Sequence, residues 1–131
     1  MNTDSRPAGG IPSLRTVAMP ADANANGDIF GGWLMSQMDL AGGTYASHIA
    51  AGRVVTIAVD AMTFYKPVHV GDQVSCYCTT DKLGRTSIAV RIETWVIRRG
   101  SPEHSEEKVT EALYTFVAVD AAGIPRPISQ S

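Results

Sequence analysis

The apolar residues between positions 32 and 51 recur at steps of three and four: Leu34, Met38, Ala41, Tyr45 and Ile49. This spacing is typical of one face of an amphipathic helix. The pattern predicts one long helix over residues 32–51, with Gly52 as its C-terminal stop. Gly42 and Gly43 lie in the middle of this segment, where each costs roughly 1 kcal/mol relative to alanine. We therefore expect another element to approach the helix backbone closely there.

The apolar residues outside this segment follow a period of two. Ile88, Val90 and Ile92 alternate with polar residues such as Ser87 and Arg91, which predicts a strand with one buried and one partly solvated face. The same reasoning predicts five strands, over residues 14–19, 54–65, 73–82, 86–98 and 108–120. The short connections favour antiparallel pairing between strands that follow one another.

A chain of 131 residues, 44% hydrophobic and 18% charged, suits a single folded domain. Residues 1–12 are mostly polar and include Gly and Pro, so we expect a flexible lead before a domain that spans residues 13–131. One strand, one helix and four strands in that order predict an α+β domain, with one helix against a strongly curved, five-stranded antiparallel sheet. One helix has too little surface to cover such a sheet. We therefore expect the sheet to continue into a second copy of the chain.

Charge and composition remove several classes of function. Eleven Lys and Arg against 13 Asp and Glu give a net charge of −2, which disfavours a nucleic-acid partner. No apolar run is long enough for a membrane span or a secretory signal, so we expect a cytoplasmic protein without a membrane partner. Cys76 and Cys78 have the spacing of neither a disulfide framework nor a zinc site, and we expect reduced, half-buried thiols. His48, His69 and His104 do not suggest a shared metal, and no metal or cofactor is expected.

Two features of the predicted helix point to chemistry. Asp39 lies inside it without a cation at helical spacing, on a strip that includes the small residues Gly32 and Gly43. A solvated helix aspartate and a carboxylate in a groove are both open interpretations. Gly31 and Gly32 leave the first N–H groups of the helix uncovered, where the helix dipole would stabilise an oxyanion. The alternative is that these glycines only allow tight packing of Trp33.

The distance between these two features predicts a shared site. Asp39 follows Gly32 by seven residues, which is roughly 10 Å along a helix. One helix cannot easily present both groups to one carbonyl. Two helices running antiparallel across a two-fold axis would bring Asp39 of one chain near Gly32 of the other, giving two equivalent sites per dimer.

Several sequence segments carry a resemblance to a known family. The longest segment, NANGDIFGGW, extends from Asn24 to Trp33. It is followed by MSQMD at residues 35–39. The others are GRVVT at 52–56, FYKP at 64–67 with VGD at 70–72, GRTS at 84–87 and FVAVD at 116–120. Together they make the chain resemble the bacterial YciA-type acyl-CoA thioesterases of the hotdog fold, over roughly residues 14–128.

This resemblance implies a hotdog domain, in which an antiparallel sheet wraps one long helix and two copies form a continuous sheet. Such dimers usually assemble as a trimer of dimers, so a homohexamer is expected. The implied reaction is hydrolysis of acyl-coenzyme A to a carboxylic acid and coenzyme A, within fatty acid metabolism. By the resemblance, Asp39 is the catalytic acid, Asn24 holds the water or the thioester, and the helix start at Gly31 and Gly32 holds the thioester oxygen. Asp39 would act as a general base or as a covalent nucleophile, and the sequence leaves both open.

The nucleotide end of coenzyme A needs cations and hydrogen-bond donors outside the reacting centre. Taken alone, Lys66, Arg85 and Arg91 are best interpreted as solvated surface charges. The resemblance favours a role in binding coenzyme A for Lys66 and above all for Arg85, with donors from Gly84, Thr86 and Ser87. Coenzyme A is part of the substrate and product, so no separate cofactor is implied.

Two other functions fit parts of this pattern. A non-catalytic acyl-CoA-binding module would use the same fold, because a scaffold alone does not imply turnover. The presence of Asp39 and Asn24 argues against it. A hotdog dehydratase or isomerase would need a histidine paired with an acid in the groove. His48 is poorly placed for that role, because it lies more than two helical turns beyond Asp39 and on another face.

Overall fold

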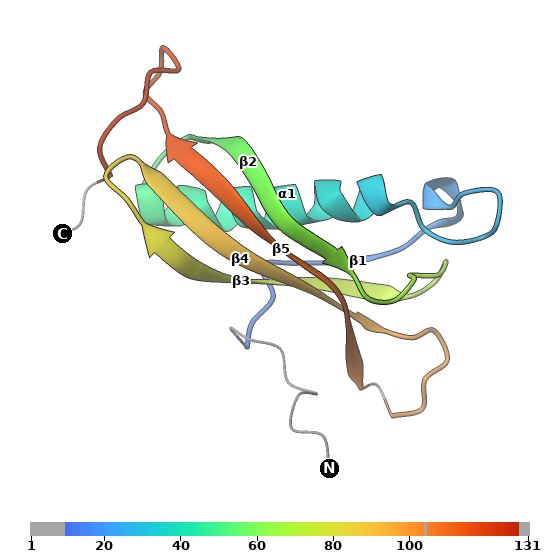
Figure 1. Cartoon of the computed structure of the whole chain (residues 1–131). Coiled ribbons are helices and arrows are strands. Elements are labelled where there is room, and N and C mark those ends of the chain that lie inside the picture. Colours follow the sequence, from blue (N-terminus) through green and yellow to red (C-terminus); the bar gives the residue numbers. More distant parts are fainter. Residues whose placement is uncertain (1–9, 104, 129–131) are drawn as a thin grey trace.

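The computed structural model describes residues 10–103 and 105–128. Residues 1–9 of the expected lead, and His104, lie outside the described residues, so the boundary between lead and domain stays a prediction. The elements are β1 (Leu14–Val17), the 3-10 helix η2 (Pro20–Asp22), α1 (Gly31–Ala50), β2 (Val54–Phe64), β3 (Gln73–Leu83), β4 (Ser87–Ile97) and β5 (Glu106–Ala118). Figure 1 shows α1 lying across one face of a curved sheet. The predicted α+β arrangement of one helix and a five-stranded antiparallel sheet is confirmed.

The order of strands in the sheet is β1-β3-β4-β5-β2. Strands β3, β4 and β5 pair as consecutive hairpins, as expected, but β2 pairs with β5 and not with β3. The expectation that each strand pairs with the next is therefore wrong at this point. Residues 65–72 cross from one edge of the sheet to its other side, a distance of about 14 Å at the usual strand spacing. Eight residues of extended chain reach that far easily.

The core lies between α1 and the sheet. Leu34, Met38 and Ala41 of the predicted stripe are buried, and Tyr45 and Ile49 are half-buried against the same cluster. They pack on the inward side chains of the strands, which include Ile88, Val90, Ile92, Ala112, Tyr114 and Phe116. The periodicity therefore predicted the correct faces of both the helix and β4.

Gly42 marks the place where α1 comes closest to the sheet. A Cβ atom added there would lie 2.6 Å from Ile92 Cδ1 and 2.8 Å from Phe116 Cζ. The nearest contact of a Cβ added to Gly43 would be an ordinary 3.8 Å. The predicted close approach to the helix backbone is thus confirmed, and Gly42 is the residue that allows it.

The C-terminal end of α1 differs from the prediction. The residue in the left-handed conformation is Ala51, with φ of 53°, and not Gly52. A Cβ added to Gly52 would lie 2.5 Å from Arg126 Nη2, the end of a flexible side chain. That Arg126 nitrogen donates a hydrogen bond of 2.8 Å to the Ala50 carbonyl. A cation from the C-terminal segment therefore caps the last turn of the helix.

Both cysteines are fully buried in β3, at 0% exposure for Cys76 and 6% for Cys78, where half-burial was expected. Neither forms a disulfide. Burial raises the pKa of the Cys76 thiol to about 12 and that of Cys78 to about 11. Both are therefore packing residues with unreactive thiols.

Strand β2 forms one edge of the sheet and exposes apolar side chains. Ile57 is 58% exposed and Val59 is 37% exposed. A long, apolar and unpaired edge is a surface that folded proteins normally cover. None of the described helices is long and apolar enough to cross a membrane.

Candidate active site

The loop before α1 is shaped by Asn24. Its side-chain Oδ1 accepts hydrogen bonds from the amides of Asn26, at 2.9 Å, and Asp28, at 3.1 Å. The Asn24 amide donates in turn to the Asp28 carbonyl at 2.7 Å. Both donors to Oδ1 are backbone N–H groups, so the oxygen end of the side chain closes the loop. The Nδ2 end has no acceptor within residues 10–103 and 105–128, and it remains as a donor for a bound group.

This loop leads directly into a helix start that has no side-chain cap. Phe30 occupies the N-cap position, where Ser, Thr, Asp or Asn is usual, and the first turn contains no acid. The amides of Gly31 and Gly32 find no acceptor in the described part of the chain. A Cβ added to Gly32 would meet nothing within 4 Å. The positive end of the helix dipole therefore borders open space beside Gly32, while the Phe64 ring lies close to Gly31.

The Asp39 carboxylate has a hydrogen-bond partner on another element, which its neighbours in the sequence do not reveal. Thr56 Oγ1, on β2, donates a hydrogen bond of 2.5 Å to Asp39 Oδ1. The structure gives Asp39 no ion pair among the described residues. Thr56 falls inside the GRVVT segment of the resemblance, but nothing in its spacing from Asp39 signals the contact. The carboxylate is thus oriented by one neutral hydroxyl.

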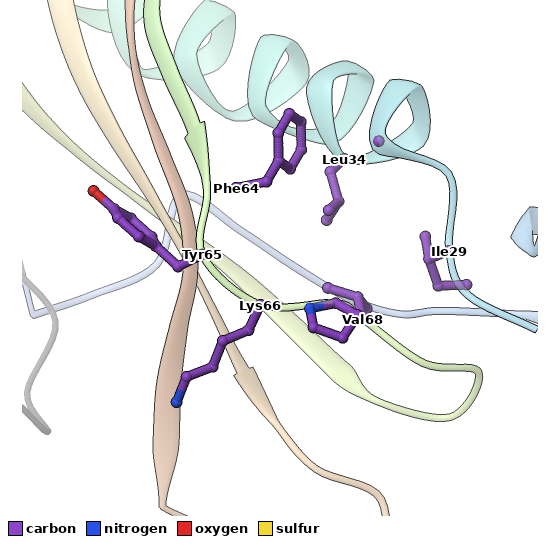
Figure 2. A pocket seen from close by; sticks show the side chains of 8 residues that line it. Ile29, Leu34, Phe64, Tyr65, Lys66 and Val68 are labelled. Carbon is purple, nitrogen blue, oxygen red and sulfur yellow. The ribbon is translucent and has the colours of Figure 1, made fainter.

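An apolar pocket of about 340 Å³ opens beside the helix start. Its wall includes Gly31 and the side chains of Ile29, Leu34, Phe64, Pro67 and Val68. Figure 2 shows Phe64 turned toward the first turns of α1, with Tyr65 and Lys66 turned away. The crossing segment after β2 therefore places a hydrophobic surface next to the uncapped amides.

Lys66 is held by an ion pair on the far side of this segment. Its Nζ lies 3.0 Å from Glu107 Oε1. This hydrogen bond, together with Arg98, lowers the pKa of the Glu107 carboxyl below its ordinary value, against the opposing effect of partial burial. Part of the Lys66 charge is therefore already neutralised by Glu107.

The turn at residues 84–87 connects β3 to β4. The Gly84 amide donates to the Ser87 carbonyl at 2.8 Å, so Arg85 and Thr86 form the tip of the hairpin. Arg85 is exposed and has no ion-pair partner in the described part of the chain. Arg91, by contrast, lies 2.9 Å from Glu111 Oε2 and 3.9 Å from Asp81 Oδ1. Arg85 is therefore the more available of these two arginines.

One chain does not bring all the predicted site residues together. Ser87 pairs with Val117 of β5, whereas Phe64 pairs with Thr110 of the same strand. Seven strand residues, or about 23 Å, therefore separate the hairpin from the Lys66 end of the sheet. Figure 1 shows the hairpin between β3 and β4 beside the C-terminal end of α1, opposite the helix start.

One chain also keeps the helix start and the Asp39 carboxylate apart. The Asn24 loop adjoins the helix start at Gly31 and Gly32, and the apolar pocket opens beside it. Asp39 lies eight residues along α1 from Gly31, which is about 12 Å. A single chain thus presents an uncapped helix start with its pocket and, separately, a carboxylate. The chemistry of this set suits attack on an acyl carbonyl.

Comparison with known proteins agrees with this chemistry. The sequence model of the thioesterase superfamily matches residues 26–102. The acyl-CoA thioester hydrolase YciA of Salmonella typhimurium is 57% identical over 126 residues, which cover 95% of this chain and 94% of that protein.

Solved structures show the same fold. The hexameric thioesterase of Yersinia pestis superimposes with a TM-score of 0.89 at 55% identity, over 95% of this chain and 99% of that one. The hexameric hotdog fold thioesterase of Campylobacter jejuni gives 0.88 at 44% identity, over 94% and 93% of the two chains. The chain therefore belongs to the thioesterase superfamily, among the acyl-CoA thioester hydrolases of the hotdog fold.

Proposed function

We propose that this chain hydrolyses acyl-coenzyme A to a carboxylic acid and coenzyme A, and that the Asp39 carboxylate carries the reaction. The observation that supports this role is its environment. Asp39 is half-buried, accepts one hydrogen bond from Thr56, and has no cation to neutralise it in the described chain. A carboxylate held in this way keeps a free oxygen for a proton or for a carbonyl carbon.

The thioester carbonyl needs a nucleophile and a stabilised oxyanion. In one route, Asp39 takes a proton from water while the water oxygen bonds to the carbonyl carbon. The C–S bond then breaks, and the proton passes to the departing thiolate. In the other route, an Asp39 oxygen attacks the carbonyl carbon and the C–S bond breaks, which releases the thiolate and leaves a mixed anhydride. Water then hydrolyses the anhydride to the carboxylic acid and the free Asp39 carboxylate, and the proton that water gives up passes to the thiolate. In both, the amides of Gly31 and Gly32 stabilise the oxyanion, and Asn24 Nδ2 holds the water or the thioester.

The geometry favours a site built from two chains. Pairing of two β2 edges across a two-fold axis would cover the exposed Ile57 and Val59 and set the two α1 helices antiparallel. Asp39 of one chain then approaches the uncapped helix start of the other. The relatives from Yersinia pestis and Campylobacter jejuni are hexamers. We propose the same assembly here, a trimer of such dimers.

The same antiparallel arrangement accounts for the separated cations. It places the β3–β4 hairpin of one chain, residues 84–87, next to the end of the partner's sheet where Lys66 lies. We propose that Arg85 binds the phosphates of coenzyme A there, with donors from Gly84, Thr86 and Ser87 and with Lys66 as a second cation. The reaction as written needs no metal or cofactor. We propose that it takes place in the cytoplasm, with acyl-CoA and further copies of the chain as the only partners required.

Release of the coenzyme A thiol from acyl-CoAs of short to long chain length tests this function. We expect turnover by the unmodified protein and a fall in kcat of roughly 10²–10⁴-fold in Asp39→Asn, because the amide accepts no proton and does not attack. Asp81→Asn makes the same change at an exposed carboxylate outside the site and should keep full activity. Cys76 and Cys78 should add no background signal, since both thiols are buried.

Two results would count against the proposal. Binding of acyl-CoA without turnover by the unmodified protein would make the chain a binding module. Full activity of Asp39→Asn, in protein with an unchanged melting temperature, would place the nucleophile or base elsewhere.

A further inference from the structure

One buried hydroxyl in the core has no part in the mechanism described above. Tyr114, on β5, is 1% exposed and stacks on Phe116 with ring centroids 6.2 Å apart. A hydroxyl in such surroundings costs free energy unless it forms a hydrogen bond. A phenylalanine would fill the same space without that requirement. The hydroxyl therefore needs an explanation of its own.

The partner of this hydroxyl lies in the helix turn that carries Asp39. Tyr114 Oη donates a hydrogen bond of 2.8 Å to the backbone carbonyl of Met35. In an α-helix the carbonyl of residue 35 also accepts the amide of residue 39. The Tyr114 hydroxyl and the Asp39 amide thus meet at one oxygen atom. Burial, with the nearby Asp39 charge as the second cause, raises the pKa of the Tyr114 phenol, so the hydroxyl keeps its proton to donate.

Strands β2 and β5 both contact the turn of α1 that carries Asp39. Thr56, on β2, binds the Asp39 carboxylate, and Thr56 pairs with Phe116 in the sheet. Val59 of β2 pairs with Tyr114 itself. Gly42, one turn further along α1, packs on Phe116 at the closest approach of helix and sheet. Two adjacent strands therefore hold the side chain and the backbone of the Asp39 turn separately.

We propose that Tyr114 is a positioning residue, which fixes the depth and rotation of the Asp39 turn by donating its hydroxyl to the Met35 carbonyl. Its role rests on the proposed function of Asp39, because it touches neither substrate nor the reacting atoms. Loss of the hydroxyl leaves the Met35 carbonyl with its helical bond alone and lets the turn shift relative to Thr56. A small displacement of a reacting group is enough to slow a reaction severalfold to a hundredfold.

Tyr114→Phe removes this hydroxyl and keeps the ring. We expect kcat to fall roughly tenfold, with KM for acyl-CoA within about twofold, since substrate contacts are untouched. Tyr45→Phe is a matched control, because Tyr45 Oη also joins α1 to the sheet, through a 2.8 Å hydrogen bond to Thr80 Oγ1. It should keep the kcat of the unmodified protein. The melting temperatures of both variants show whether either substitution lowers the stability of the fold.

The effect should also depend on the carboxylate itself. In an Asp39→Asn background, Tyr114→Phe should lower the residual rate by less than twofold, because a residue that acts through Asp39 has nothing left to position. A tenfold loss that persists in that background would overturn the proposal, and so would equal losses in Tyr45→Phe and Tyr114→Phe or an unchanged kcat in Tyr114→Phe. Failure of the Asp39 proposal is seen separately, as full activity of Asp39→Asn alone.

Discussion

At the scale of single residues, the two ends of the Asn24 side chain differ in what they contact. Its oxygen accepts two amides of its own loop, whereas its nitrogen has no protein acceptor in the described chain. The observed loop contacts and the proposed contact with the water or the thioester therefore belong to different atoms. A substitution that changes only the nitrogen can separate them.

Asn24→Asp keeps two acceptor oxygens for the loop and removes the Nδ2 donor. We expect the melting temperature to stay within a few degrees and kcat/KM to fall roughly tenfold to a hundredfold, because the new negative charge also opposes an oxyanion nearby. Asn26→Asp makes the same chemical change at an exposed position of the same loop and should have little effect. Equal losses in both variants would show that the loop, and not the donor, limits the reaction.

Some residues of the candidate site could be predicted from the sequence, and others could not. Asp39 and the paired glycines stand out because a carboxylate without a cation and an uncovered helix start are local features. The contacts that orient Asp39 are not local. Thr56 follows it by 17 residues, and Tyr114 reaches a carbonyl 79 residues away in the sequence. Only the folded sheet brings these hydroxyl groups to the helix.

At the scale of elements, the depth of α1 against the sheet is set by Gly42. Gly42→Ala would place a methyl group against Ile92 and Phe116, both fully buried. We expect the free energy of unfolding to fall by up to about 2 kcal/mol, because overpacking of roughly 1–3 kcal/mol outweighs the gain of about 1 kcal/mol in helix propensity. Gly43→Ala has ordinary space and should raise the free energy of unfolding by up to about 1 kcal/mol.

Chemical denaturation of the two variants measures these changes. The contrast between neighbouring glycines is the informative result, since both substitutions gain the same helix propensity. If both substitutions raised the free energy of unfolding, Ile92 and Phe116 would have moved to make room for the methyl group at residue 42. The close approach of α1 to the sheet would then have no role in placing the Asp39 turn.

The elements themselves were predictable from the sequence, and their pairing was only partly so. All six predicted segments end within two residues of the observed helix and strands. Periodicity specifies which face of an element is buried, but it does not specify the neighbour, so the pairing of β2 with β5 was missed. The helix end was misassigned because Ala51 adopts a left-handed φ that usually belongs to glycine.

At the scale of the whole molecule, one chain presents two separated halves of the proposed site. The helix start, the Asn24 loop and the apolar pocket lie together, and the carboxylate lies about 12 Å further along the helix. The exposed edge of β2 offers the surface on which a second copy would pair. The sequence predicted this need for a partner from area alone, because one helix cannot cover five strands.

A mixing experiment tests the shared site most directly. Asp39→Ala removes the carboxylate, and Gly32→Pro removes one amide at a position with open space, where the first turn of a helix tolerates proline. Each variant alone should be inactive. The two chains carry different affinity tags, are co-expressed, and are purified through both tags in turn, so that mixing is verified before thiol release is measured.

In a mixed dimer one site receives both defects and the other receives neither. We predict that hexamers purified through both tags regain about one quarter of the unmodified activity, because chains that pair at random form mixed dimers in about half of cases and each mixed dimer has one intact site of two. Verified mixed dimers without any regained activity would contradict the account, because Asp39 and the helix start would then have to act within one chain.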